Sequence, residues 1–249
     1  MKGVVLAGGT GSRLFPLTRV TNKHLLPVGR YPMIYHPIMR LKRVGCTEIA
    51  ILTSPEHMGD VVNLLGSGFR FGVDFTYRVQ DEPGGIAQAM GLCENFTGND
   101  SFIVMLGDNI LADDFPVDVT EFMSGSMTMA GRAHVLLKEV PDPERYGVPR
   151  LQDDTIVEVI EKPTHPPSDY SVIGVYLFDP KVYDIIRSLR PSDRGELEIS
   201  DVISHYAQTK MLSHGVIRGW WGDAGTLEGY QEANSLAKDL VYEEIPVSE

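Results

Sequence analysis

A glycine-rich turn after a short apolar run is the part of this sequence best suited to binding an anion. It lies in Leu6-Ala7-Gly8-Gly9-Thr10-Gly11-Ser12-Arg13-Leu14, and Lys23-His24-Leu25-Leu26-Pro27-Val28 follows shortly after. Glycine lets backbone N–H groups approach a phosphate closely. A P-loop would place Gly-Lys-Ser/Thr at the next helix start, and a dinucleotide loop would have a third glycine where Leu14 stands.

Arg13 distinguishes this loop from both patterns, because its planar guanidinium can donate to two phosphate oxygens at once. A glycine cluster alone is equally typical of a plain turn between a strand and a helix. Together with Arg13 and the segment Lys23–Val28, it predicts a site for a nucleoside triphosphate.

Two aspartates stand in turns at the ends of apolar segments. Asp108 lies in Gly107-Asp108-Asn109, and Asp223 lies in Trp220-Trp221-Gly222-Asp223-Ala224-Gly225-Thr226. Aspartate in such a turn commonly bonds its own backbone. A divalent cation on triphosphate oxygens needs one or two carboxylates and takes water and phosphate as its other ligands. The two aspartates are therefore candidate metal ligands, although spacing alone does not show that they meet.

Four further segments carry groups that could bind ligands, and each has a simpler structural explanation. Glu161-Lys162 could bind a sugar hydroxyl and a phosphate, or form a salt-bridged strand end. Gln80 with Pro83-Gly84-Gly85 could contact a nucleobase edge, or form a hairpin-like loop. Arg194–Ile199 is charged and is typical of a solvated helix start. Trp220-Trp221 is more typical of a core than of a binding surface.

The overall charge limits the classes of partner. The 249 residues carry a formal net charge of −12, with 43% hydrophobic and 22% charged residues, as in an ordinary globular protein. Nucleic acid and anionic membranes would favour a basic face, so we expect neither as a partner. An anionic substrate would then need local cations, which makes Arg13, Lys23, Lys162 and Arg194 informative.

Cysteine use and hydropathy predict a cytoplasmic protein. Cys46 and Cys93 have neither metal-ligand nor disulfide spacing, which is consistent with a reducing compartment. The apolar run at the N-terminus is too short for a signal peptide, and no segment approaches the length of a membrane span. We find no Ser-His-Asp order, cysteine nucleophile or zinc spacing, so we favour phosphoryl-type transfer, which needs no protein nucleophile.

Hydrophobic periodicity predicts strands that alternate with helices, which indicates an α/β fold with a largely parallel sheet. Such sheets bind ligands at the carboxyl ends of their strands, where the glycine loop and Asp108 lie. We expect one domain over 1–249, with a nucleotide part near 1–110 and a sugar-phosphate part near 111–240. The expected strands are Lys2–Ala7, Glu48–Thr53, Val73–Val79, Ser101–Leu106, Met127–Val140, Thr155–Ile160, Val172–Phe178 and Leu212–Ile217, and the helices are Pro32–Arg43, Glu56–Leu65, Gly85–Cys93, Pro180–Leu189, Ile199–Gln208 and Thr226–Asp239.

Ordered motifs along the chain resemble the glucose-1-phosphate thymidylyltransferases of the sugar nucleotidyltransferase superfamily. The resemblance runs from residue 1 to about 240, and Asp142–Val148 and Arg194–Ile199 are more particular to the thymidylyl branch. The motifs are Leu6–Leu14, Lys23–Val28, Gln80–Gln88, Leu106–Asn109, Asp142–Val148, Glu161–Pro163, Arg194–Asp201 and Trp221–Thr226.

The resemblance implies a Rossmann-like three-layer α/β/α fold with a mixed, mainly parallel central sheet. It also implies Mg²⁺-dependent conversion of dTTP and glucose 1-phosphate to dTDP-glucose and pyrophosphate, the first step towards dTDP-deoxysugars such as dTDP-rhamnose. A homo-oligomer, either a dimer or a tetramer, is expected.

The resemblance also implies roles for matching residues. Arg13, Lys23 and Lys162 would be catalytic, and Asp108 and Asp223 would hold the metal. The nucleotide would contact Leu6, Gly8, Gly9, Thr10, Gly11, Ser12, Arg13, His24, Gln80, Pro83, Gly85 and Asp108. The sugar phosphate would contact Asn109, Tyr146, Gly147, Glu161, Lys162, Val172, Arg194 and Trp221.

Two departures from the family pattern bear on these expectations. His24 stands where many members have glutamine, which bears on selectivity for dTTP over UTP. An amide donates and accepts together, whereas a neutral imidazole donates at one nitrogen and accepts at the other. The sequence ends at Glu249, before the C-terminal stretch of longer members that helps build an interface and a regulatory nucleotide site, so feedback control is left open.

Three alternatives remain at this point. The first is a sugar-1-phosphate transferase of the same fold that uses UTP or CTP. The second is a catalytically silent nucleotide-sugar-binding subunit, which would be expected to have lost Arg13, Lys23, Asp108 or Asp223, although all four are present. The third is a dinucleotide-dependent oxidoreductase, against which the missing third glycine argues.

Overall fold

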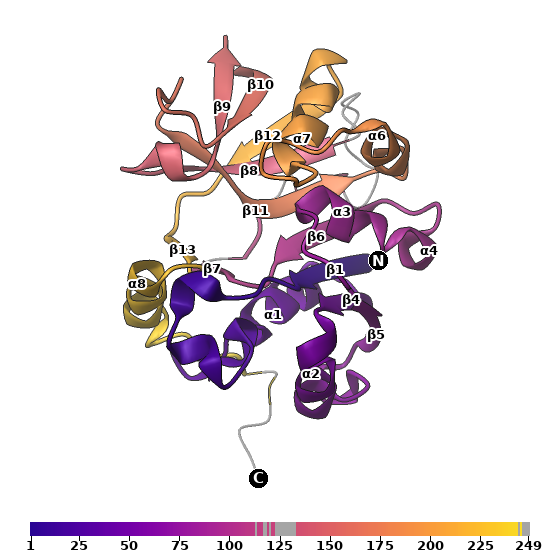
Figure 1. Cartoon of the computed structure of the whole chain (residues 1–249), viewed down its shortest axis with the longest axis vertical. Helices are drawn as coiled ribbons and strands as arrows, with labels where there is room; N and C mark the ends of the chain where they lie inside the picture. Colours follow the sequence, from indigo (N-terminus) through magenta and orange to yellow (C-terminus); the bar gives the residue numbers. More distant parts are fainter. Residues whose placement is uncertain (113, 117–118, 120, 123–132, 244, 246–249) are drawn as a thin grey trace. The chain divides into compact units, whose positions relative to one another are not determined.

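The computed structural model describes residues 1–112, 114–116, 119, 121–122, 133–243 and 245 (Figure 1). The chain forms two compact units that are interleaved along the sequence. The first contains Met1–Pro83, Met105–Asp114 and Gly219–Glu249, and the second contains Gly84–Val104 and Phe115–Arg218. The single domain expected from the sequence stays a prediction. Residues 84–104 group with the second unit, and the C-terminal segment returns to the first.

The first unit is built on the parallel strands β1 (Lys2–Ala7), β4 (Glu48–Thr53) and β5 (Asp74–Val79). Residue by residue, β1 pairs with β4 from Lys2↔Glu48 to Ala7↔Thr53, and β4 pairs with β5. Nearly all side chains of β1 and β4 are apolar and buried, whereas those of β5 are partly exposed and include Thr76 and Arg78. The helices α1 (Tyr35–Arg43) and α2 (Met58–Leu65) lie on the same side of these strands (Figure 1).

Short elements complete the first unit and carry most of the residues of interest. The chain leaves the end of β6 (Phe102–Leu106) into β7 (Asn109–Leu111), which pairs antiparallel with β13 (Trp221–Asp223). Strands β2 (Pro27–Val28) and β3 (Tyr31–Pro32) form a small hairpin. Helix α8 (Leu227–Ala237) packs against β13, as Figure 1 shows, and the Thr226 side chain caps it by accepting from the Gly229 N–H.

The second unit has a mixed strand arrangement. Strands β9 (Gly147–Gln152) and β10 (Thr155–Glu161) form an antiparallel hairpin, β11 (Tyr170–Phe178) pairs antiparallel with β8 (Ala133–Glu139) and β9, and β12 (Leu212–Val216) runs parallel to β8. Its helices are α3 (Ile86–Gly91), α4 (Glu94–Thr97), α6 (Val182–Ser188) and α7 (Ile199–Gln208).

Most of the elements expected from periodicity are present with small shifts at their ends. β1, β4 and α7 have the expected bounds. The helix expected from Pro32 is a correction: Pro32 belongs to β3, and α1 begins at Tyr35 because the β2–β3 hairpin uses the preceding residues. The strand expected over Met127–Val140 is described from Ala133, and 127–132 lie outside the described residues.

None of the helices in the described part of the chain combines the length and the apolar character that a membrane crossing would require.

Candidate active site

The glycine loop leaves the end of β1 and presents Arg13 to solvent. Gly11 has a left-handed backbone (φ 68°), a conformation that glycine adopts without strain, and Thr18 Oγ1 donates to its carbonyl at 2.8 Å. A short 3₁₀ helix, Ser12–Leu14, follows. Because Leu14 is fully buried and anchors this turn, the neighbouring Arg13 side chain is exposed beside the loop.

Lys23 lies beneath this loop and pairs with Asp108. It starts a 3₁₀ helix, Lys23–Leu25, that Asn22 caps by accepting from the His24 N–H at 2.8 Å. The Lys23 ammonium lies 2.6 Å from Asp108 Oδ2, and both side chains are almost buried. Such a charged pair is held in one geometry by its surroundings.

Asp108 and Asp223, whose convergence was open from the sequence, lie together. The Gly107 N–H donates to the Leu6 carbonyl at 2.9 Å, which sets Asp108 beside the end of β1. Asp223 pairs with Asn109 in the β13–β7 ladder, and the Ala224 N–H donates to the Asp108 carbonyl at 2.9 Å.

Gly225 shows how closely the charged groups approach one another. A methyl group added at Gly225 would lie 2.9 Å from Asp223 Oδ1, 3.1 Å from Asp108 Oδ2 and 3.3 Å from Arg13 Nη2. Two carboxylates and a guanidinium therefore surround the same small volume, and a side chain larger than hydrogen there would press on all three. The sequence contained Gly225 in a recognised motif, but nothing local indicated this contact.

The pKa values of the two aspartates move in opposite directions. Burial alone would raise the pKa of Asp108, but the Lys23 ammonium and hydrogen bonds from Lys23 and Asn109 outweigh it and hold that pKa below its ordinary value. Burial and the negative charge of Asp108 raise the pKa of Asp223, against the opposing charges of Lys23 and Arg13. Asp223 is thus a carboxylate whose charge lacks full compensation.

This arrangement fits a divalent cation that takes part of its shell from a substrate. Among the described residues, no group of three or more His, Cys, Asp or Glu side chains could hold a metal by itself. Asp108 and Asp223 supply two carboxylates, and magnesium is commonly bound by one or two carboxylates together with water and substrate phosphates. A cation beside them would also offset the repulsion that raises the pKa of Asp223.

His24 and Gln80 lie against the glycines of this region. His24 is 1% exposed, its Nδ1 lies 2.8 Å from Asn22 Oδ1, and burial followed by the charge of Lys23 lowers its pKa to about 3. Its neutral ring packs on Gly107. This burial does not favour the expected contact between His24 and a nucleotide. Gln80 is also buried, with its amide oxygen against Gly8.

Asn109 and Trp221 were expected at the sugar phosphate, but hydrogen bonds connect them to Asp108 in the first unit. Trp221 Nε1 donates to Asn109 Oδ1 at 2.8 Å, and Asn109 Nδ2 donates to Asp108 Oδ1 at 3.2 Å. Trp221 is half-buried, and Trp220 packs on the small core behind it. The hydrogen bonds from Trp221 to Asn109 and from Asn109 to Asp108 therefore fix Oδ1 of Asp108, while Lys23 holds Oδ2.

The second unit gathers the other residues expected at the sugar phosphate. In the β9–β10 and β9–β11 pairings, Gly147 lies opposite both Glu161 and Val172. Lys162 follows Glu161 with a left-handed backbone (φ 44°), and its N–H donates to the Tyr146 carbonyl at 2.9 Å. A positive φ at a residue other than glycine is strained and is often found at functional sites.

Two residues not singled out from the sequence hold Glu161 and Arg194. Ser200 Oγ donates to Glu161 Oε2 at 2.6 Å. Arg194 donates through Nε to Glu198 Oε1 at 3.2 Å and through Nη2 to Glu198 Oε2 at 2.8 Å. Glu198 is buried and lies four residues after Arg194, and this spacing was the feature of the sequence that could have indicated the ion pair.

Gly85 and Pro83 fall on the two sides of the division between the units. Gly85 (φ 96°) precedes α3 and lies against the backbone of Leu197, whose N–H donates to the Gly84 carbonyl at 2.8 Å. Pro83 ends the first stretch of the first unit. Gly85 therefore belongs with the loop that carries Arg194.

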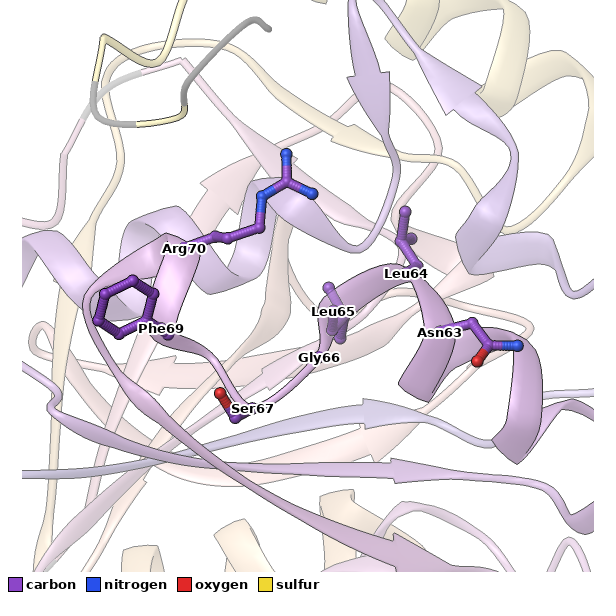
Figure 2. A pocket seen from close by; sticks show the side chains of 7 residues that line it. All are labelled: Asn63, Leu64, Leu65, Gly66, Ser67, Phe69 and Arg70. Carbon is purple, nitrogen blue, oxygen red and sulfur yellow. The ribbon is translucent and has the colours of Figure 1, made fainter. Parts of the chain in front are cut away.

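A separate pocket of about 250 Å³ lies at the end of α2, and none of the predicted site residues lines it (Figure 2). Its walls come from a short stretch of chain rather than from strand ends. The lining residues are Asn63, Leu64, Leu65, Gly66, Ser67, Phe69 and Arg70.

Known proteins resemble this chain over nearly its whole length. The model of the nucleotidyl transferase family matches residues 2–239. The chain is 40% identical over 243 residues to a glucose-1-phosphate thymidylyltransferase of Neisseria meningitidis, covering 96% of this chain and 83% of that protein. It is 42% identical over 239 residues to the low-salt glycan biosynthesis nucleotidyltransferase Agl11 of Haloferax volcanii, covering 95% of this chain and 66% of that protein.

A solved structure agrees over nearly the whole chain. It is a Bacillus anthracis protein assigned as a glucose-1-phosphate thymidylyltransferase, crystallised in complex with sucrose. It has a TM-score of 0.92 and 55% identity, and the match covers 98% of each chain. The α/β fold with a mixed, mainly parallel central sheet expected from the sequence is thus confirmed, and the oxidoreductase alternative is not supported. The chain belongs to the nucleotidyl transferase family, and its resemblance to the glucose-1-phosphate thymidylyltransferases is confirmed.

Proposed function

We propose that this protein transfers a thymidylyl group from dTTP to glucose 1-phosphate, giving dTDP-glucose and pyrophosphate. The observation that carries the proposal is the convergence of Asp108, Asp223 and Arg13 around Gly225, with Lys23 paired to Asp108. This cluster suits a triphosphate and a cation, and relatives that share most of the chain have this activity in their names.

The reaction needs a nucleophile that the substrate itself supplies. A phosphate oxygen of glucose 1-phosphate attacks the α-phosphorus of dTTP, the new P–O bond forms, and the bond from that phosphorus to the leaving pyrophosphate breaks in line. Positioning and charge stabilisation do nearly all of the catalytic work in such transfers. The absence of a protein nucleophile from the motifs is consistent with this chemistry.

In the first unit, Arg13 and Lys23 would neutralise negative charge on the triphosphate. Arg13, which is exposed, would donate to the departing phosphates, and the buried Lys23 ammonium is paired with Asp108. Asp108 and Asp223 would hold Mg²⁺, which supplies Lewis-acid stabilisation of phosphate charge when bound. The rest of the glycine loop would contact the triphosphate through its backbone, and Gln80 would contact the base.

In the second unit, Lys162 and Arg194 would bind the phosphate of the sugar substrate. Glu161 would accept a hydrogen bond from a sugar hydroxyl. Ser200 donates to Oε2 of Glu161, and Arg194 Nη2 donates to Oε1 at 3.3 Å, with Lys162 Nζ 3.4 Å from the same oxygen. Tyr146, Gly147 and Val172 would line the sugar. A side chain larger than hydrogen at Gly147 would press on Ser200 Oγ at 3.1 Å.

The burial of His24 bears on the nucleotide preference. His24 replaces a glutamine of many relatives, but its ring is buried on Gly107 and bonded to Asn22. Histidine in place of glutamine at position 24 would therefore change the packing against Gly107 and Asn22 rather than a contact with the base. We propose that dTTP remains the preferred substrate.

A panel of nucleotides tests the proposal. The protein is incubated with Mg²⁺, glucose 1-phosphate and dTTP, UTP or CTP in turn, and pyrophosphate release is followed. We expect the highest kcat/KM with dTTP and no release without Mg²⁺. A higher kcat/KM with UTP or CTP overturns the base assignment in favour of the alternative transferase, and no release with any nucleotide overturns the function itself.

We further propose a cytoplasmic homo-oligomer, either a dimer or a tetramer, acting first in dTDP-deoxysugar synthesis. A triphosphate substrate and the two reduced, buried cysteines support the compartment. Light scattering after gel filtration gives the oligomeric state, and a monomer at all concentrations would contradict it.

A further inference from the structure

Helix α8 contacts both segments that carry the triphosphate-binding groups of the first unit. It begins four residues after Asp223, and it packs on β2, which begins four residues after Lys23. A small core joins these segments behind the charged cluster. It contains Val28, Met33, Ile110, Ala224, Ala233 and Ala237, with Trp220, Tyr230 and Leu240 against it.

Two polar side chains of α8 bind the backbone after the Lys23 segment directly. Tyr230 Oη donates to the Pro27 carbonyl at 2.7 Å, and Asn234 Oδ1 accepts from the Gly29 N–H at 3.0 Å. Asn234 Nδ2 also donates to the Tyr230 carbonyl at 3.0 Å, and this bond within α8 orients the Asn234 side chain that accepts from Gly29. The two residues are four apart and so share one face of α8.

Close packing at glycines reinforces these two hydrogen bonds. Gly29 (φ 61°) lies directly against the Ala237 carbonyl, and a methyl group at Gly222 of β13 would lie 3.2 Å from Ala233 Cβ. One helix face thus touches the turn after β2 and the strand that ends in Asp223. A shift of the turn relative to α8 would move Lys23 relative to Asp223.

We propose that Tyr230 and Asn234 are positioning residues that fix Lys23 against Asp108 and Asp223. The inference rests on the proposed function in one respect, namely that Lys23 acts on the triphosphate. Neither side chain needs to touch substrate. A misplacement of about 1 Å caused by a change far from the chemistry can cost on the order of 10²-fold in rate.

The experiment compares Tyr230→Phe, Asn234→Ala and the double variant with the wild-type protein. We expect kcat/KM for dTTP to fall about 3-fold, about 10-fold and about 30-fold, because each change removes contacts to the turn without altering a charge. The KM for glucose 1-phosphate should stay within about 2-fold. Asn234→Asp keeps an oxygen to accept from the Gly29 N–H but loses the donor to the Tyr230 carbonyl, so its activity should lie between those of Asn234→Ala and the wild type.

A double-mutant cycle separates positioning from a general structural role. In a Lys23→Met background, Asn234→Ala should cost less than about 2-fold more, because the group that it positions is already gone. Gln231→Ala, an exposed change on the same helix, is the control and should match the wild type. Hydrogen exchange at the Gly29 amide should be faster in Asn234→Ala.

The possible outcomes distinguish failure of the proposed function from failure of the positioning role. If the wild type turns over no nucleotide, the proposed function fails, and the exchange result still reports on the contact to Gly29. The inference alone is overturned if the wild type is active and the variants match it, or if they lose thermal stability at unchanged kcat/KM. It is also overturned if Asn234→Ala costs the same with and without Lys23.

Discussion

Lys23 Nζ lies 2.6 Å from Asp108 Oδ2, and only about a tenth of each side chain is exposed (10% and 12%). The two residues are 85 positions apart in the sequence, and a further hydrogen bond supports each of them. Asn22 caps the turn that begins at Lys23, and Asn109 donates to the second oxygen of Asp108. A buried pair of this kind is costly to break and is cheap to replace as a whole.

Lys23→Met should therefore destabilise the protein more than the double variant Lys23→Met/Asp108→Asn. The single change leaves an unpaired buried carboxylate, which costs about 3–5 kcal/mol, whereas the double change leaves no charge. Both variants should lose on the order of 10²–10³ in kcat. Urea unfolding and pyrophosphate release give the two quantities. Equal stability of the two variants would show that the pair is solvated in solution.

Asp223→Asn should raise stability while it removes activity. Because the folded-state pKa of Asp223 is raised by burial and by Asp108, the ionised form is disfavoured in the folded protein, and a neutral amide relieves that cost at pH 7. Without divalent cations we expect a higher Tm, and with Mg²⁺ a kcat lower by on the order of 10²-fold. Asp239→Asn, an exposed change, is the control. A lower Tm would contradict the incompletely compensated charge assigned to Asp223.

Gly225→Ala should abolish most activity, whereas Gly59→Ala should not. The added methyl at Gly225 meets Asp223 Oδ1 at 2.9 Å and Arg13 Nη2 at 3.3 Å, but at Gly59 of α2 it meets nothing within 4 Å. Alanine in a helix is favoured over glycine by about 1 kcal/mol, so Gly59→Ala should be slightly stabilising. Full activity in Gly225→Ala would mean that the charged groups do not converge as described.

Glu198→Gln and Glu196→Gln form a matched pair around Arg194. Both remove one negative charge, but Glu198 holds the guanidinium through two hydrogen bonds, whereas Glu196 Oε2 lies 3.6 Å from Nη2. We expect the KM for glucose 1-phosphate to rise about 10-fold in Glu198→Gln, since a charged hydrogen bond contributes about 1.5–3 kcal/mol, and less than 2-fold in Glu196→Gln. If the two variants behave alike, the charge and not the orientation of Arg194 matters.

His36 should contribute to loss of stability in mild acid. Burial lowers its pKa from 6.5 to about 4, and it bonds Tyr242 Oη and the Val28 carbonyl. The unfolded chain therefore binds a proton between pH 6.5 and 4 that the folded one does not, so stability falls as the pH falls through this window. Between pH 7 and 5 this amounts to about 2 kcal/mol. Urea unfolding of His36→Gln should show that much less acid sensitivity, and an unchanged difference would contradict it.

The sequence by itself determined the elements whose signal is local. The continuous apolar runs of β1 and β4 gave the bounds of these strands, because nearly every side chain in them is buried. The bounds of α7 followed from its amphipathic pattern, because burial along a helix repeats about every 3.6 residues. The glycine loop and its arginine also predicted an anion site before any fold was known. The resemblance then assigned roles to individual residues.

Only the tertiary structure decided which of those residues meet. Strands β7 and β13 have three residues each and no periodic signal, yet their pairing sets Asp223 against Asn109 across more than a hundred residues. The burial of His24, the fit of Gly225 and the hold of Glu198 on Arg194 are likewise contacts between segments or turns. The conformation of such a short segment is determined by the other segments that it contacts, so its own sequence is not enough to predict it.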